Sequence, residues 1–341
     1  MDALMPTTDF MSIDQSSTKS VDDSSISIVI PCFNAIAYLE RAIDSLKQQE
    51  GVNDQIIVID DGSTDGSINL IKSLPSVDVW KSGPNKGACA ARNRGLSLAI
   101  FPYVMFLDAD DYLDTGTLKG LVSALKDSRS IFAIAPMVMI NDTGERISKT
   151  LPRNDKVTNF IADWVRGRYV SPCSILWKTE AVRRLGGWNE SLSKNQDGDI
   201  VLRAALTIDK VAISSCGAGI YWCHDGESRI SNSLDETKLR DSFYVFSNIY
   251  EQLKKRGMRC DEIDNAFSYA THSLERLAAR NRLYNIKKKI KDDKFFEEVK
   301  DYRKDAGWPY AEGPPLHIFL SRIIGLDRKE RLAHQLKSLM H

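Results

Sequence analysis

A short apolar run leads directly into an acidic loop at Tyr103-Val104-Met105-Phe106-Leu107-Asp108-Ala109-Asp110-Asp111. The apolar part is typical of a strand that is buried on both faces of a sheet. The carboxylates that follow repel one another, which is unfavourable unless a cation neutralises them. Mg²⁺ and Mn²⁺ take oxygen ligands and suit such a loop. The alternative interpretation is an acidic cap at the N-terminus of the next helix.

Strands and helices alternate on both sides of this loop. Strands are expected at Ile26–Ile30, Gln55–Ile59 and Val77–Trp80, and helices at Ile36–Leu46 with Asn34 as its cap, Ser67–Leu74, Gly87–Ile100 and Thr115–Leu125. Such alternation predicts an α/β fold with a mostly parallel sheet and helices on both faces. Because the carboxyl ends of parallel strands meet at one edge, Asp60-Asp61 and Asp108–Asp111 should share a crevice.

The rest of the chain divides into a mixed segment and a helical one. Strands are expected at Ser130–Ile140, Pro172–Trp177, Val211–Ile213 and Ile220–Trp222, and helices at Thr179–Leu185, Asn195–Thr207, Leu234–Met258, Ala266–Ile286, after Lys287–Lys291, and at Asp327–Met340. We therefore expect a disordered polar leader over residues 1–24, an α/β domain over 25–232 and a helical C-terminal region over 233–341.

Composition excludes several classes of protein. Lys and Arg together number 46, as do Asp and Glu, so no overall positive field favours nucleic acid. The six cysteines include no pair at the spacing of a thiolate zinc site, and we expect reduced thiols in a cytoplasmic protein. No signal peptide is recognisable, and the longest apolar run, Ile131–Ile140, is too short to span a membrane.

Four further segments are candidates for chemistry, and each has a structural alternative. Asp60-Asp61 follows a buried strand and can accept hydrogen bonds from a ligand, or simply form a turn. In the small-residue helix at Gly87–Gly95, Arg92 and Arg94 should face different sides, one of them toward a phosphate or both as surface residues.

The other two candidates lie further along the chain. Asp197, after Gln196, would be a general base at the start of a helix, or else a capping residue. His224, just past a strand, would contact a metal or phosphate, or else be a polar loop residue.

Taken in order, these segments resemble the family 2 inverting glycosyltransferases of the GT-A fold, a Rossmann-like architecture. The matching segments are Val29-Ile30-Pro31-Cys32-Phe33-Asn34, Val58–Asp65, Asn85-Lys86-Gly87 with Ala91-Arg92-Asn93, Phe106–Asp111 and Gln196-Asp197. The resemblance extends from about Ser25 to Asn232. Many relatives carry Glu where this chain has Gln196, which leaves the base in place but puts any role of the missing charge in acceptor choice in question.

The resemblance implies a role for each matching residue. Asp61 would bind the nucleotide base, in a pocket lined by Pro31, Phe33 and Asn34. Asp108 would lie against the ribose, and Asp110 would bind Mn²⁺ or Mg²⁺ bridging the diphosphate. Asp111 is left as the helix cap. Arg92 would support the acidic loop or the phosphates, Asp197 would be the catalytic base, and His224 would be a further metal or diphosphate ligand.

The implied reaction moves a sugar from a nucleoside diphosphate, most often UDP in this family, to a hydroxyl of a glycan, lipid-linked or protein-linked acceptor, as in bacterial surface polysaccharide synthesis. A nucleotidyltransferase or NAD-dependent oxidoreductase should show a Gly-rich loop after the first strand, where this chain has Pro31–Asn34. A non-catalytic nucleotide-binding scaffold that kept the fold remains an alternative. The basic run Lys287–Lys291, with Arg280 and Arg282, either is a solvated face or contacts anionic lipid at the inner face of the cell membrane.

Overall fold

The computed structural model describes residues 22–126, 128–150, 155–223, 235–281 and 283–299. The expected leader falls mostly outside these residues, as does the helix expected at Asp327–Met340. The division into a leader, an α/β domain and a helical region therefore stays a prediction.

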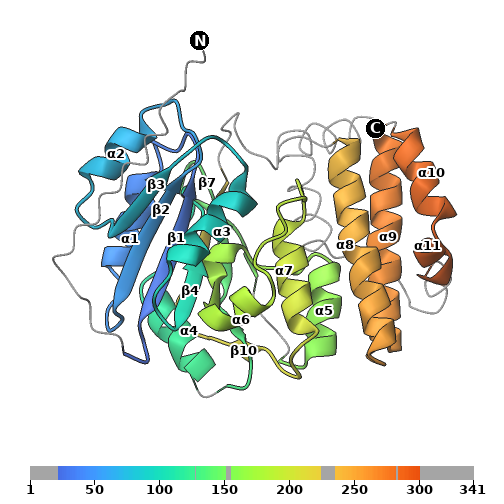
Figure 1. The fold of residues 1–341 in the computed structure, drawn as a ribbon. Coiled ribbons are helices and arrows are strands. Elements are labelled where there is room, and N and C mark those ends of the chain that lie inside the picture. The colour runs from blue at the N-terminus through green and yellow to red at the C-terminus, as the bar shows by residue number, and fades with distance from the viewer. Residues whose placement is uncertain (1–21, 127, 151–154, 224–234, 282, 300–341) are drawn as a thin grey trace, which may run out of the picture.

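The predicted α/β class is confirmed by a sheet with helices packed against it (Figure 1). The sheet has seven strands in the order β10-β6-β9-β4-β1-β2-β3. Its strands are β1 (Ile26–Cys32), β2 (Asp54–Asp60), β3 (Val79–Ser82), β4 (Tyr103–Phe106), β6 (Phe132–Ile134), β9 (Ile175–Lys178) and β10 (Ala212–Ile213). All neighbours pair in parallel except β9, which is antiparallel to both β4 and β6.

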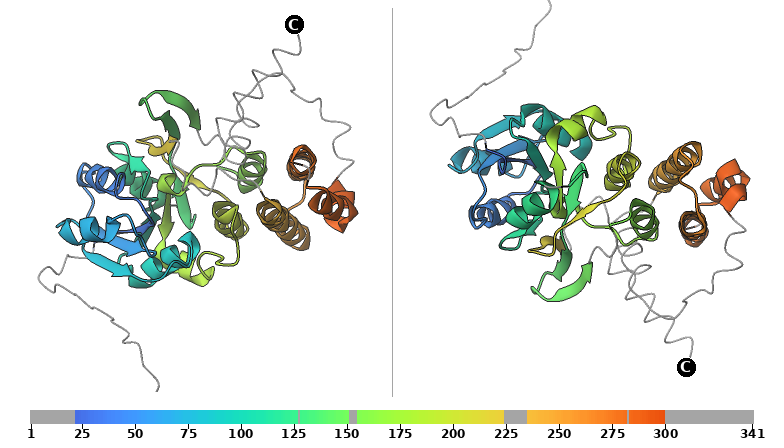
Figure 2. Two further views of the ribbon diagram at one scale, coloured as in Figure 1. Left: turned by 90° about the horizontal axis from the view of Figure 1, so that it is seen from above. Right: turned by 90° about the horizontal axis from the view of Figure 1, so that it is seen from below.

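Helices cover both faces of this sheet, as Figure 2 shows from above and below. The helices of the α/β part are α1 (Leu39–Lys47), α2 (Ser67–Ser73), α3 (Ala88–Leu98), α4 (Thr117–Lys126), α5 (Val157–Val165), α6 (Thr179–Arg184) and α7 (Gln196–Ala205). In β1, Ile28 and Ile30 pack into one buried cluster with α1 and α4, while Val29 packs into the opposite cluster with α3. This burial on both faces explains why Ile28, Val29 and Ile30 are consecutive apolar residues.

Two local predictions were wrong. The helix expected from Ile36 begins only at Leu39, and Asn34 does not cap it. The strand expected over Ser130–Ile140 is two strands, β6 and β7 (Met137–Asn141), which belong to different sheets. Pro136 lies between them and has no N–H to donate to a ladder, so the chain leaves the first sheet there.

A second sheet of four strands has the order β5-β11-β7-β8, formed by β5 (Tyr112–Leu113), β7, β8 (Arg146–Thr150) and β11 (Gly219–Cys223). Residues 219 and 220 of β11 pair with β5, which directly follows the acidic loop. The second sheet thus lies beside the carboxyl end of β4.

The C-terminal helices confirm the predicted helical appendage. They are α8 (Glu236–Lys255), α9 (Asp261–Arg280), α10 (Tyr284–Asp292) and α11 (Lys294–Val299). One buried apolar cluster runs from β1 and α3 through α5 and α7 into α8, α9, α10 and α11, so the appendage shares the core of the sheet.

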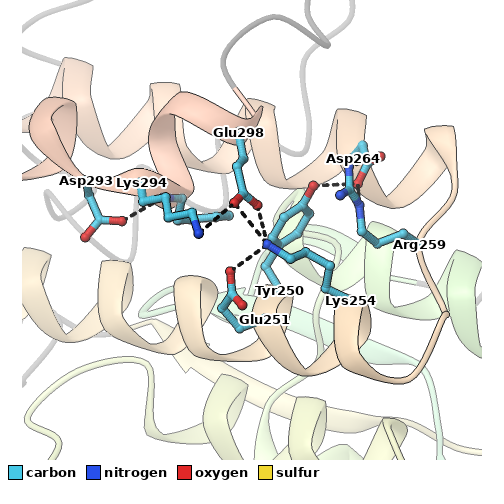
Figure 3. A network of polar contacts seen from close by, with 9 residues as sticks. Tyr250, Glu251, Lys254, Arg259, Asp264, Asp293, Lys294 and Glu298 are labelled. Atoms are coloured by element: carbon cyan, nitrogen blue, oxygen red, sulfur yellow. Dashed lines mark hydrogen bonds and ion pairs between the residues drawn. The ribbon is translucent and has the colours of Figure 1, made fainter.

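A polar network joins the C-terminal end of α8 to α9 and α11 (Figure 3). Lys254 of α8 donates to both carboxylate oxygens of Glu298 at 2.9 and 2.7 Å and to Glu251 at 3.1 Å. Asp264 of α9 accepts from the Tyr250 hydroxyl at 2.8 Å and from the Arg259 guanidinium at 2.9 and 3.0 Å. These contacts tie α8 to both α9 and α11.

Candidate functional site

A cavity of about 530 Å³ opens at the carboxyl ends of β1, β2 and β4. Its volume is in the range of pockets that hold small molecules. Eight of the nine predicted site residues line it, namely Pro31, Phe33, Asn34, Asp61, Arg92, Asp108, Asp110 and Asp197. The ninth, His224, lies outside the described residues.

The loop after β1 forms one wall of the cavity. Asn34 has a φ of 50° and bridges to the loop after β2: its N–H donates to Ser63 Oγ at 2.9 Å, and its Oδ1 accepts from the Thr64 N–H at 2.8 Å. Phe33 is 45% exposed, so an aromatic face is available at the cavity. The hydrogen bonds of Asn34 fix this loop, and the exposed Phe33 ring can pack against a flat group of a ligand.

Asp61 and Asp60 have different surroundings. Asp61 lines the cavity, and its two oxygens accept from the backbone N–H groups of Lys86 and Gly87, each at 2.8 Å. Each oxygen keeps a lone pair for a further donor. Asp60 instead accepts from the Ser82 hydroxyl at 2.6 Å and from the Ser63 N–H at 3.2 Å, which makes it a residue of the turn.

Arg92 is a buried cation in the cavity wall. Its guanidinium donates to Asp108 Oδ1 at 2.5 Å and lies over the Trp188 ring at 4.4 Å. Burial would lower the pKa of Arg92, but the carboxylates of Asp108 and Asp197 outweigh it and raise that pKa. Arg94, two residues later, is exposed, so the prediction that the two arginines face different sides is confirmed.

Negative charge gathers around Arg92. Burial raises the pKa of Asp108, and the Asp110 and Asp197 carboxylates raise it further, while Arg92 lowers it. A cavity in which carboxylates destabilise one another favours the binding of a cation. Asp110 lines this cavity and offers the oxygen donors that a hard divalent ion takes.

The described residues hold no group of three or more His, Cys, Asp or Glu placed to bind a metal. Mg²⁺ is commonly bound by one or two carboxylates together with substrate phosphates and water. The donor set at Asp110 therefore fits a metal that a diphosphate helps to hold.

Asp111 is not the helix cap that we expected. It is 1% exposed and accepts from the Ser171 hydroxyl at 3.0 Å and from the Trp222 N–H at 3.2 Å. Helix α4 begins only at Thr117, and strand β5 lies between Asp111 and that helix. Asp111 is therefore too far from the N-terminus of α4 to cap it.

The first turn of α7 brings Asp197 to the cavity. Asn195, with a φ of 58°, precedes the helix, and Gln196 donates to the Leu192 carbonyl at 2.7 Å. A Cβ on Gly198 would lie 2.1 Å from Asn195 Oδ1. Any other residue at position 198 would therefore force the Asn195 side chain to move. Gln196 Oε1 also lies 3.5 Å from Arg92 Nη1, which links α7 to the buried arginine.

Sequence patterns missed part of the cavity wall. It includes Trp164, Tyr169 and Tyr221, and Ser242 from α8. The neighbouring Asp241 accepts from both the N–H and the hydroxyl of Ser193, at 2.8 and 2.6 Å. These residues come from separate elements that only the folded chain brings together, and no spacing in the sequence signals them.

Two further predictions concern the state of the cysteines and membrane-spanning segments. All six cysteines are free, of which Cys216 and Cys260 are exposed and the others buried. Within the described residues, no helix has both the length and the apolar character needed to cross a membrane.

Comparison with known proteins finds similarity to glycosyltransferases. The sequence model of glycosyl transferase family 2 matches residues 27–186. An uncharacterized glycosyltransferase of Haemophilus influenzae is 27% identical, over 68% of this chain and 90% of the relative. The chondroitin synthase of Pasteurella multocida is 26% identical over 78% of this chain, which spans only 27% of that relative.

Solved structures share the fold. S. aureus TarS 1-349 in complex with UDP-GlcNAc has a TM-score of 0.57 and 18% identity, with 82% of this chain and 90% of that chain covered. The predicted GT-A fold is confirmed by this likeness.

Proposed function

Because residues 27–186 belong to glycosyl transferase family 2, we propose that this glycosyltransferase moves a sugar from a UDP-sugar to an acceptor hydroxyl with inversion at the anomeric carbon. The observation that carries the proposal is that Asp61, Arg92, Asp108, Asp110 and Asp197 line one cavity. S. aureus TarS, which shares the fold, has been crystallised with UDP-GlcNAc, and this supports uridine as the base.

In this proposal the donor lies along the carboxyl edge of the sheet. Asp61 accepts a hydrogen bond from the base, Phe33 packs against the base, and Pro31 and Asn34 complete its pocket. Asp108, held by Arg92, accepts from the ribose. Asp110 would hold Mn²⁺ or Mg²⁺, with His224 as a further ligand, and when bound the ion would neutralise charge on the departing diphosphate.

Asp197 acts on the acceptor in the same proposal. Its carboxylate takes the proton of an acceptor hydroxyl as the oxygen forms a bond to the anomeric carbon. The bond from that carbon to the diphosphate oxygen breaks on the opposite face, and the electron pair leaves with UDP. A single displacement of this kind inverts the configuration. Arg92 stabilises charge near the diphosphate electrostatically.

The test is release of UDP from a panel of UDP-sugars, with and without Mn²⁺, in the presence of glycan acceptors. We expect turnover with at least one donor, and loss of turnover when EDTA removes the metal. Tight UDP binding without turnover for any donor and acceptor would instead favour a non-catalytic nucleotide-binding scaffold. Formation of UTP and a sugar 1-phosphate from a UDP-sugar, only when pyrophosphate is added, would favour a nucleotidyltransferase.

The acceptor is proposed to be a glycan hydroxyl, free or on a lipid or protein carrier. The similarity to the Pasteurella multocida chondroitin synthase supports a polysaccharide acceptor. The aromatic side chains of Trp164, Tyr169 and Tyr221 also line the cavity and give it apolar faces for a sugar ring.

We also propose that α10 contacts anionic lipid, which would bring the enzyme to a lipid-linked acceptor at the inner face of the cell membrane. In α10, Ile286 and Ile290 are buried, whereas Lys288, Lys289 and Lys291 are exposed. Arg282 lies outside the described residues. Sedimentation with anionic vesicles at low salt should carry the protein down and high salt should release it. Absence of binding at low salt would remove this proposal.

A further inference from the structure

A guanidinium stack lies behind the acidic loop. The Arg41 side chain of α1 lies between the rings of Tyr112 and Trp222, with its central carbon 4.7 and 3.8 Å from the two ring centres. Both distances are within the range of a cation–π contact. Tyr112 belongs to β5 and Trp222 to β11, so three elements meet at Arg41.

Arg41 also bonds the loop that carries the acidic residues. Its Nη2 donates to the backbone carbonyl of Asp110 at 2.9 Å. The Nε of the same guanidinium is buried and has no hydrogen-bond partner among the described residues. Burial lowers the pKa of Arg41, while Tyr112, Asp111 and Asp110 raise it. Burial of a cation and of an unpaired donor each costs free energy of folding, so stability alone does not account for Arg41 at this position.

The backbone of Trp222 also contacts the acidic loop directly. Its backbone N–H donates to Asp111 Oδ1 at 3.2 Å, while the other oxygen of Asp111 accepts from Ser171. Tyr38, which lines the cavity, packs edge-on against the Trp222 ring at 5.1 Å. The stack therefore extends from the back of the loop to the cavity wall.

We propose that Arg41 is a positioning residue for Asp110: its guanidinium, which lies over the Trp222 ring, holds the Asp110 carbonyl and so sets the direction of the carboxylate that would receive the metal and diphosphate. This inference rests on the proposed function, in which Asp110 binds the ion. Lysine at position 41 would keep the charge but lose the planar stack and the directed donors, because only the guanidinium is flat.

The test is titration of Mn²⁺ into the full chain with saturating UDP, followed by calorimetry. Arg41→Lys should weaken Mn²⁺ binding about tenfold, the size usual for residues that orient a metal ligand. Arg184→Lys is the matched control, because Arg184 is exposed on α6 and does not line the cavity. It should bind Mn²⁺ as the wild type does.

A second variant keeps the test decisive. Trp222→Leu removes the ring at 3.8 Å and should weaken Mn²⁺ binding as well, and the double variant should be no weaker than the worse single one. Thermal melting without ligand verifies that each variant is folded at the titration temperature. Unchanged Mn²⁺ affinity in folded Arg41→Lys, or effects that add in the double variant, would overturn the inference. A wild-type chain that binds neither UDP nor Mn²⁺ would overturn the proposed function instead.

Discussion

Asp197 and Asp241 are carboxylates on different helices; Asp197 lines the cavity, and Asp241 bonds Ser193, which also lines it. At the scale of single residues, what distinguishes them is their partners. Asp241 is 6% exposed and bonds twice to Ser193, which is a structural role. Asp197 is partly exposed in the first turn of α7 and lines the cavity, where an acceptor hydroxyl could reach it.

Substitution of this base tests the residue assignment. Asp197→Asn removes the proton acceptor and keeps the shape of the side chain, so transfer should fall by ~10²–10⁴-fold while UDP binding is retained. The measurements are steady-state turnover and UDP affinity by calorimetry. Gln196→Glu, next to it in the same turn, is the matched comparison and should keep turnover. Transfer at the wild-type rate in Asp197→Asn would refute the base role.

Thiol reactivity gives a second prediction at this scale. Burial raises the pKa of Cys32 and of Cys89 to about 12, from an ordinary value of 9.0. Below pH 9 both therefore stay neutral, and since the thiolate is the nucleophile they should not react. At pH 8 a thiol reagent should label Cys216 and Cys260 quickly in the native protein. Mass spectrometry of the labelled peptides measures this.

The raised pKa values of Cys32 and Cys89 also determine how the stability of the fold changes with pH. Folding favours the neutral thiols, so their contribution to stability is complete below pH 9 and is lost as the pH rises toward 12. Rapid labelling of Cys32 or Cys89 at pH 8, without unfolding, would contradict the burial of these residues.

At the scale of elements, the most informative contact is the one between α8 and the loop before α7. The loop carries Ser193, Lys194 and Asn195 along the cavity wall, and Asp241 of α8 accepts two hydrogen bonds from Ser193. A helix of the C-terminal region thereby orients the segment that leads to Asp197.

Removal of this contact should affect transfer more than donor binding. In Asp241→Ala, Ser193 loses two hydrogen bonds to a charged group, each worth about 1.5–3 kcal/mol, and the loop before α7 loosens. We expect kcat to fall while the Kd for UDP stays nearly constant, because the donor side of the cavity is untouched.

The control for Asp241→Ala is Glu251→Ala, a carboxylate on the same helix whose partner is Lys254 at the far end of the appendage (Figure 3). That variant should keep kcat. Equal losses of kcat and UDP affinity in Asp241→Ala would indicate general unfolding rather than a loosened loop.

At the scale of the whole molecule, the helical region and the sheet share one apolar core. Trp164 of α5 and Phe246 of α8 belong to the same buried cluster, and α5 packs directly against α9. Apolar area removed from water stabilises by roughly 25 cal/mol per Å². Separation of the two parts would expose a large share of this surface.

A truncation tests the shared core. A chain that ends at residue 232 should aggregate, or melt at a markedly lower temperature than the full chain, and should lose transfer because Asp241 is gone. Differential scanning calorimetry and size-exclusion chromatography measure this. The matched comparison is a chain that ends at residue 299, which keeps α8 to α11. A monomeric, cooperatively melting fragment of residues 25–232 would show that the two parts are independent.

Much of the sheet could be read from local pattern. The largely apolar runs at Ile26–Ile30 and Gln55–Ile59 are typical of strands that are buried on both faces. Where an apolar run crosses from one sheet to another, as at Pro136, or where pairing depends on a distant partner, as in β5 and β8, local pattern carries no such signal. Helix α5 was missed, although its buried face is apolar.

That Asp61, Asp108 and Asp110 share a cavity was foreseeable because they follow strands at one edge of a parallel sheet, whereas Arg92 and Asp197 were expected there only from the family resemblance. For the three carboxylates that follow strands, sequence order alone carried that information, together with the acidic character of the loop after Leu107. What each carboxylate does there depends on its partners in space. Asp111 bonds Ser171 and Trp222, Arg41 lies between two rings, and Asp241 reaches the loop before α7. These pairs are far apart in the chain, and only tertiary packing brings their atoms within bonding distance.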